Sequence, residues 1–150
     1  MGMRICFHLY LECYLMDYNR SIDSDKRKNM RIILAESEHY IVVSEYEDCY
    51  LMFKDRSRGS VSVGTFYGDA EFALIDRNER FVVTGGCGIV IYFLREPWED
   101  YSVDKQTDQW IELGIGDTDI YYDAVRQISD TAIEITDADG NISTYDVFSR

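Results

Sequence analysis

Residues 80–94 read RFVVTGGCGIVIYFL, two apolar runs separated by a glycine-rich break. The runs at 80–84 and 88–93 are rich in β-branched and aromatic residues, which pack well in strands. The GGCG between them tolerates the positive φ angles of a tight turn. The stretch therefore predicts a β-hairpin closed by a four-residue loop.

Two chemical interpretations of GGCG are weaker than a hairpin turn. A phosphate-binding glycine loop joins a strand to a helix, whereas a strand-like run follows here, and Ile91 replaces the third glycine of a G-x-G-x-x-G motif. A reactive Cys87 would need a nearby cation to lower the pKa of its thiol. No Lys or His is its neighbour in the sequence, so the turn is favoured and the exposure of Cys87 stays open.

The same alternation of short β-rich runs and turn residues continues along the chain. Strands are predicted at 39–44, 49–53, 60–66, 71–75, 80–84, 88–93, 109–113, 119–125, 131–136 and 142–148. Segments rich in Gly, Asp and Asn separate them at intervals of mostly nine to twelve residues. The pattern predicts an all-β antiparallel meander of about ten short strands, forming either a two-sheet sandwich or a twisted propeller-like sheet.

Two further stretches have both a structural and a chemical interpretation. DADGN (137–141) resembles a calcium loop, but its glycine is fourth and Phe148 stands where a ligating Glu would be twelfth, so a hairpin turn is favoured. In GSVSVG (59–64) the G-x-S-x-G motif of a nucleophile elbow would centre on Ser62, but Ser60 stands where the first glycine should be. A strand-like run rather than a helix surrounds it, so this interpretation is rejected. EPWEDYSVDKQTD (96–108) is the longest predicted loop, with room for one helical turn.

The N-terminal segment has its own pattern. Residues 5–16 alternate apolar and mixed positions, which predicts a half-buried strand, and the polar linker NRSIDSDKRKN (19–29) follows. Met30 offers a second start, so residues 1–29 are either part of the fold or an appendage. Residues 30–150 are predicted to form a single all-β domain. We expect no signal peptide and no membrane span.

Composition limits the class of partner. The chain has 28 acidic and 15 basic residues and a formal charge of −13, which disfavours nucleic acid and anionic membranes and favours a basic protein partner. The four cysteines have no C-x-x-C spacing, so we expect free thiols in a reducing cytoplasm. With two histidines and no closely spaced ligands, the sequence predicts no catalytic, metal or cofactor site, and it leaves the oligomeric state open.

Acidic and aromatic residues concentrate between positions 96 and 123. Nine carboxylates face a single cation, Lys105, in these 28 residues, which also hold both tryptophans. Aromatic anchors with carboxylates are typical of a surface that binds a cationic partner. The alternative is a solvated surface with Trp110 in the core. The predicted binding residues are Glu96, Trp98, Glu99, Asp100, Tyr101, Asp104, Asp108, Asp117, Asp119 and Tyr121.

The stretch GDAEFALIDRNERFVVTGGCGIVIYFL (68–94) resembles segments of small acidic bacterial immunity proteins of polymorphic or contact-dependent toxin systems. It covers about a fifth of the chain, as a strand–turn–strand pattern. The resemblance implies a cytoplasmic, non-enzymatic protein that neutralises a cognate toxin. These families share no binding motif, so no functional residue is transferred.

Three functions from different classes remain. The leading expectation is a non-enzymatic protein-binding module, in concrete form an immunity or inhibitor protein that occludes a basic toxin or nuclease. The first alternative is a small β-fold hydrolase that uses carboxylates or Cys87. The second is a structural or scaffold module, which would associate through exposed sheet edges.

Overall fold

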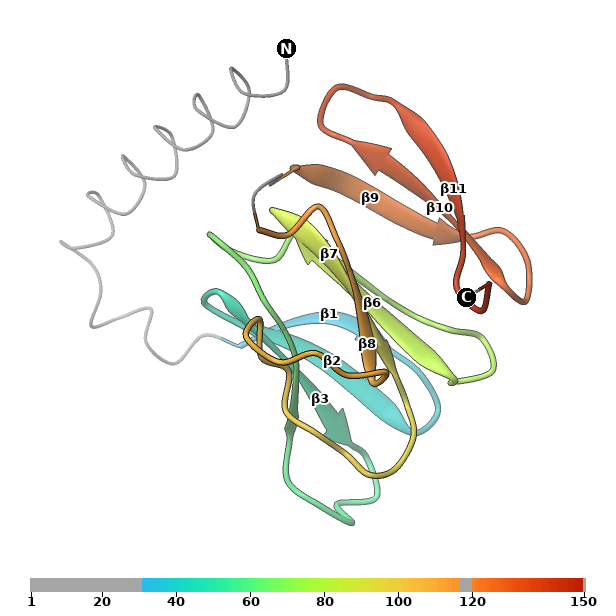
Figure 1. Ribbon diagram of the computed structural model, residues 1–150. Coiled ribbons are helices and arrows are strands. Elements are labelled where there is room, and N and C mark those ends of the chain that lie inside the picture. Colours follow the sequence, from blue (N-terminus) through green and yellow to red (C-terminus); the bar gives the residue numbers. More distant parts are fainter. Residues whose placement is uncertain (1–30, 117–119, 150) are drawn as a thin grey trace, which may run out of the picture.

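The computed structural model describes residues 31–116 and 120–149, and within them every regular element is a β-strand (Figure 1). Eleven strands form three antiparallel sheets. The predicted all-β antiparallel meander is therefore confirmed. The strand predicted at 5–16 and the linker at 19–29 lie outside the described residues.

Each sheet is a run of consecutive strands. Sheet 1 contains β1 (Ile32–Glu36), β2 (Tyr40–Glu45), β3 (Asp48–Phe53) and β4 (Val61–Thr65). Sheet 2 contains β5 (Phe72–Ile75), β6 (Phe81–Gly86), β7 (Gly88–Phe93) and β8 (Trp110–Leu113). Sheet 3 contains β9 (Tyr122–Gln127), β10 (Ala132–Asp137) and β11 (Ile142–Asp146). Neighbours in the sequence are thus neighbours in each sheet.

Strands β6 and β7 are buried along their whole length, because sheet 2 is covered on both faces. Side chains of a strand alternate between its two faces. Val82 and Tyr92 pack in the core shared with sheet 1, whereas Val83 and Ile91 pack in the core shared with sheet 3. The molecule therefore has two apolar cores and three sheets, one more than a two-sheet sandwich.

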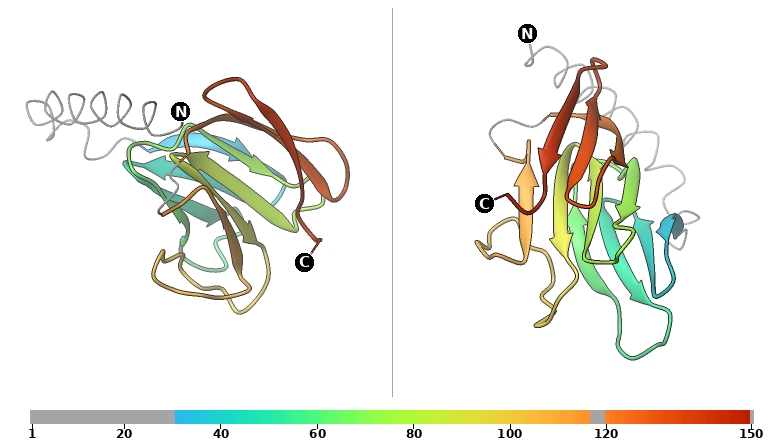
Figure 2. Two further views of the ribbon diagram at one scale, coloured as in Figure 1. Left: turned by 45° about the horizontal axis from the view of Figure 1, so that its top comes forward. Right: turned by 90° about the vertical axis from the view of Figure 1, so that its right-hand side faces the viewer.

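The sheets succeed one another in an open, propeller-like manner. Strand β5 contacts β1 on one side and β9 on the other, so the first strands of the three sheets lie together. Figures 1 and 2 show sheet 2 between the other two sheets. Of the two arrangements expected from the sequence, the propeller-like one is the nearer description.

The GGCG turn is tighter than the predicted four-residue loop. Gly85 pairs with Ile89 and Gly86 with Gly88, which leaves Cys87 at the apex. Only Gly88 among these residues has a positive φ, of 95°. Gly85 is needed for space instead, because a Cβ there would lie 2.4 Å from the Phe72 ring. The hairpin prediction is confirmed, and the glycines have different roles within it.

Two other segments differ from expectation. Strand β1 was not predicted, because its short apolar run directly follows a polar linker and two of its residues, Ile32 and Ile33, are exposed. Residues 96–108 form an irregular loop without a helical turn. At 137–141 the structure has the predicted hairpin turn, with Gly140 at a φ of 82°.

Candidate protein-binding surface

Residues 94–109, here called the acidic loop, connect β7 to β8 and carry most of the predicted binding residues. Buried polar groups fix its backbone. The Tyr92 hydroxyl donates to the Glu99 carbonyl oxygen at 2.6 Å, and the Gln109 amide donates to the carbonyl oxygens of Phe93 and Arg95 at 2.6 and 3.1 Å. A surface fixed in this way loses little conformational entropy when it binds.

Tyr101 is not presented to a partner, which corrects its assignment as a binding residue. Its side chain is 7% exposed and packs with its ring centroid 5.2 Å from that of Trp110 in the core. The Tyr101 hydroxyl donates to Glu112 at 2.6 Å, and its amide donates to the Ser62 carbonyl oxygen at 2.9 Å. Burial, together with the Glu112 carboxylate, raises the pKa of Tyr101.

Two carboxylates of the acidic loop are already paired within it. Glu99 forms an ion pair with Lys105, and Asp108 lies 3.1 Å from the Arg95 guanidinium. From 95 to 108 the loop has five carboxylates and two cations, a net charge of −3. Since Arg95 and Lys105 neutralise two of these carboxylates, the loop carries less excess negative charge than the nine carboxylates and one cation of residues 96–123 imply.

The remaining three carboxylates of the loop are exposed: those of Glu96, Asp100 and Asp104. The Asp100 carboxylate accepts a hydrogen bond from the Ser62 amide at 2.9 Å, which fixes the loop to β4. Within the described residues, the carboxylates of Glu96 and Asp104 have no ion pair or hydrogen bond. These two are the groups most available to a cationic partner.

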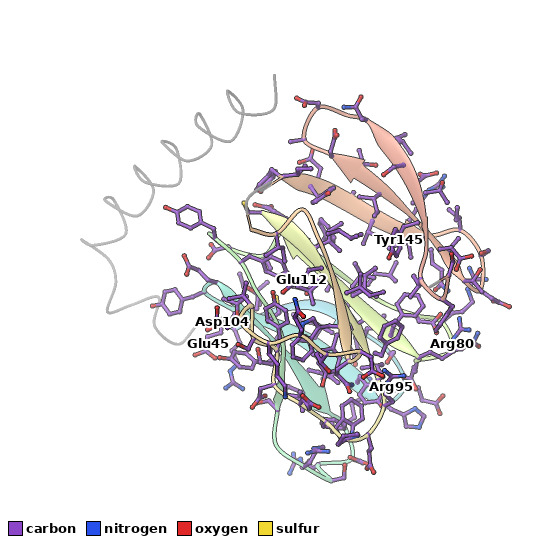
Figure 3. All side chains as sticks on the ribbon, viewed as in Figure 1. Glu45, Arg80, Arg95, Asp104, Glu112 and Tyr145 are labelled. Carbon is purple, nitrogen blue, oxygen red and sulfur yellow. The ribbon has the colours of Figure 1, made fainter. Side chains whose placement is uncertain are left out.

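Tyr121 is held by contacts outside the acidic loop, and its assignment as a binding residue stays a prediction. Tyr121 forms a β-bridge with Cys87, at the turn end of sheet 2, and its hydroxyl donates to Glu71. The acidic loop begins at the opposite end of β7, but it returns along β8, since the Tyr101 hydroxyl donates to Glu112, which pairs with Val90 of β7. In the view of Figure 3, Asp104 of the loop lies near Glu45 of β2 and well apart from Arg95. Asp117 and Asp119 lie outside the described residues.

Trp98 belongs to an aromatic cluster that the sequence did not reveal. Its ring is perpendicular to that of Phe53, with the two centroids 5.0 Å apart, and Tyr40 lies 5.5 Å from Phe53. We call Tyr40, Phe53 and Trp98 the aromatic corner. Its members come from β2, β3 and the acidic loop, so no local sequence signal connects them. The guanidinium of Arg58 lies against the corner.

Other chemistry has little support in the part of the chain that the structure describes. No group of three His, Cys, Asp or Glu side chains there is arranged to hold a metal ion. Cys49 is buried, and burial raises the pKa of its thiol to about 12, which leaves it protonated and unreactive at neutral pH. Cys87 is partly exposed at the hairpin apex. Within the same residues, no helix has the length and apolar character needed to cross a membrane.

The structure thus defines an all-β protein with an acidic, rigid loop beside an aromatic cluster. Comparison with known proteins adds no relative: no family model matches the sequence, and neither the curated proteins nor the solved structures contain a significant match. Functional inference for this chain therefore depends on its own geometry.

Proposed function

We propose that this protein is a non-enzymatic module that binds a basic protein, in concrete form an immunity or inhibitor protein that occludes a toxin or nuclease. One observation carries the proposal: the acidic loop has a fixed backbone, and it bears the half-buried Trp98 together with the unpaired carboxylates of Glu96 and Asp104. Fixed charges beside an aromatic anchor are what a tight, selective interface requires.

The proposed mechanism is occlusion of a basic cleft. The formal charge of −13 attracts a cationic partner at long range and raises the rate of association. Trp98 then contributes apolar contact area, which slows dissociation. The proposal retains Glu96, Trp98, Glu99, Asp100, Asp104 and Asp108 as partner-binding residues. It leaves out Tyr101, which is buried, and does not depend on Tyr121, whose hydroxyl donates to Glu71.

The test first requires a partner, sought as a basic protein that co-purifies with this one from its own cells or as a basic domain encoded by a neighbouring reading frame. We expect the association rate constant to fall about tenfold between about 0.05 and about 0.5 M salt, because the Debye length shrinks below ~10 Å. Double reversal, Glu96→Lys with Asp104→Lys, should lower the same rate constant at low salt.

The matched control reverses two exposed carboxylates of sheet 3, Asp123→Lys with Asp139→Lys. This variant has the same net charge as the loop variant but leaves the acidic loop intact. A salt-independent association rate, or equal effects of the two double variants, contradicts the proposal.

A second candidate function, a self-associating scaffold, rests on the sheet edges. Ile33 on β1 is 61% exposed and Ile142 on β11 is 65% exposed, and each strand is the edge of its sheet. Exposed apolar edge strands favour pairing between chains. Sedimentation at increasing concentration tests this: association that Ile142→Lys abolishes supports the scaffold, and a monomer at all concentrations excludes it.

A further inference from the structure

The aromatic corner already holds a cation. The carbon at the centre of the Arg58 guanidinium lies 5.7 Å from the centroid of the Phe53 ring and 5.6 Å from that of the Trp98 ring. Both distances are within the range in which a cation is attracted to the face of an aromatic ring. Because the two rings are perpendicular, they form two walls around one guanidinium.

Arg58 differs from the other arginines that lie over rings. Arg80 and Arg95 also have cation–π contacts, but they are paired with the carboxylates of Asp76 and Asp108. Within the described residues, Arg58 has no ion pair and no hydrogen bond. Its contact with the corner is therefore the one interaction that positions this guanidinium there.

The surroundings of the corner favour positive charge. Burial raises the pKa of Tyr40, and the negative charges of Glu79 and Asp55 raise it further, so both carboxylates act at the corner. A cation placed between the rings gains from this field, whereas a neutral group does not.

Arg58 can leave the corner at low structural cost. It lies in residues 54–60, the connection between β3 and β4, and all seven residues of this connection are exposed. Moving it requires no rearrangement of either apolar core. Exchange of Arg58 for another cation would conserve the charge in the corner.

We infer that the aromatic corner is a binding site for a guanidinium or ammonium side chain of the partner, and that Arg58 occupies this site until the partner displaces it. The inference rests on the proposed function, since it takes the partner to be a basic protein. It adds the residues that recognise one cationic side chain, Phe53 and Trp98, with Tyr40 packed against both rings.

Arginine amide is the probe for this site, and citrulline amide, in which a neutral ureido group replaces the guanidinium, is its analogue of nearly the same shape. Both are used with an acetylated α-amino group, so that the guanidinium is the one charge that differs. Calorimetry on Arg58→Ala should show that arginine amide binds about tenfold more tightly than to the intact protein, because one cation–π competitor has been removed. The fluorescence of Trp98 should change on binding, while the buried Trp110 gives a constant background.

Three further variants serve as controls for this test. Arg56→Ala removes the same charge from the same connection, and Arg56 has no ring contact among the described residues, so this variant should bind the probe as the intact protein does. Arg58→Gln keeps a polar side chain and should reproduce the tighter binding. Phe53→Leu added to Arg58→Ala should abolish it.

The outcomes distinguish failure of the cation site from failure of the proposed function. Equal binding by the Arg56 and Arg58 variants, or equal binding of arginine amide and citrulline amide, overturns the cation site. Slower dissociation of the basic partner from Arg58→Ala than from Arg56→Ala supports it. If the probe binds as expected but association of the partner is independent of salt, the site stands and the proposed function fails.

Discussion

Glu79 joins the first two sheets through three contacts with the β1–β2 turn. Its carboxylate accepts hydrogen bonds from the Ser37 hydroxyl at 2.5 Å and the His39 amide at 2.9 Å, and it lies 2.6 Å from Nδ1 of His39. The hydrogen bond with Glu79, and then its negative charge, raise the pKa of His39 above the ordinary value of 6.5. The contact between Glu79 and His39, 40 positions apart in the sequence, therefore depends on the protonation of the imidazole.

This coupling predicts a pH dependence. Because the pKa of His39 is raised in the folded state, the pair stabilises the fold fully below pH 6.5 and loses this contribution as the pH rises through the folded-state pKa. An NMR titration of the imidazole should give a pKa above 6.5 that falls in Glu79→Gln. Glu38→Gln is the control, because Glu38 is a smaller cause of the shift. Equal pKa values in both variants would refute the assignment.

Asp76 is the buried carboxylate that ties sheet 2 to sheet 3. It is 1% exposed, and it accepts hydrogen bonds from Arg80 at 2.6 Å and from Gln127 at 2.7 Å. Burial opposes its ionisation, but the hydrogen bonds from Arg80 and Gln127 outweigh burial, so the pKa of Asp76 is below 3.8. In the sequence it is one Asp of the turn DRNE (76–79), and no local feature marks it as buried.

We expect Asp76→Ala to lower the free energy of unfolding by about 3 kcal/mol at pH 7, because the Arg80 guanidinium loses its partner. The pKa of Asp76 is lowered in the folded state, so its contribution is present above pH 3.8 and disappears as the pH falls through the folded-state pKa. Urea unfolding at pH 7 and pH 3 measures both effects. Asp104→Ala, at an exposed carboxylate, should change stability by less than about 0.5 kcal/mol at either pH.

At the scale of the element, the GGCG hairpin shows what a sequence pattern can and cannot specify. Two β-rich runs around glycines were enough to predict strand, turn and strand. The need for each glycine depends on partners outside the hairpin: Gly85 faces Phe72 of β5, and a Cβ at Gly88 would lie 2.3 Å from Ile115. Such contacts arise only after the sheets have packed.

Replacing Gly88 with Ala should therefore be costly. The φ of 95° is unfavourable for Ala, and the new Cβ would clash with Ile115, so we expect a loss of about 3 kcal/mol in the free energy of unfolding. Gly59→Ala is the matched control, since nothing lies within 4 Å of a Cβ there. Thermal and urea unfolding of both variants provide the measurement. A Gly88 variant as stable as the Gly59 variant would show that the hairpin relaxes.

The acidic loop was predictable in part. Its length and the exposure of Glu96 and Asp104 follow from composition, because consecutive charged and turn residues do not enter a core. The sequence could not tell which aromatic residue would be exposed, because Tyr101 is buried through contacts with β4 and β8. Residues distant in the sequence, Phe53 and Arg58 among them, completed the aromatic corner only through tertiary packing.

At the scale of the whole molecule, sheet 2 determines the architecture. An antiparallel strand with one solvated face alternates apolar and polar residues. In β6 and β7 this alternation is absent, since Thr84 is the single polar side chain apart from that of Tyr92. Residues 81–93 therefore carried a signal for a sheet covered on both faces. Which strands would supply the two covering layers was not encoded locally.

Because β6 and β7 contribute to both cores, we expect the described part of the molecule to unfold in one cooperative transition. Val82 and Val83 are adjacent and fully buried, but they face sheet 1 and sheet 3 respectively. Val82→Ala and Val83→Ala should each lower the free energy of unfolding by about 2 kcal/mol, from lost burial and a small cavity.

Two probes can locate the effect of these variants. Tryptophan fluorescence reports the core between sheets 1 and 2, because Trp110 lies in this core and Trp98 packs against it, whereas far-ultraviolet circular dichroism reports all strands. In both variants the two urea transitions should coincide and move together to lower concentration. If Val83→Ala instead produced an early transition in circular dichroism while the tryptophan fluorescence transition stayed in place, sheet 3 would unfold independently. The shared sheet would then not couple the two cores.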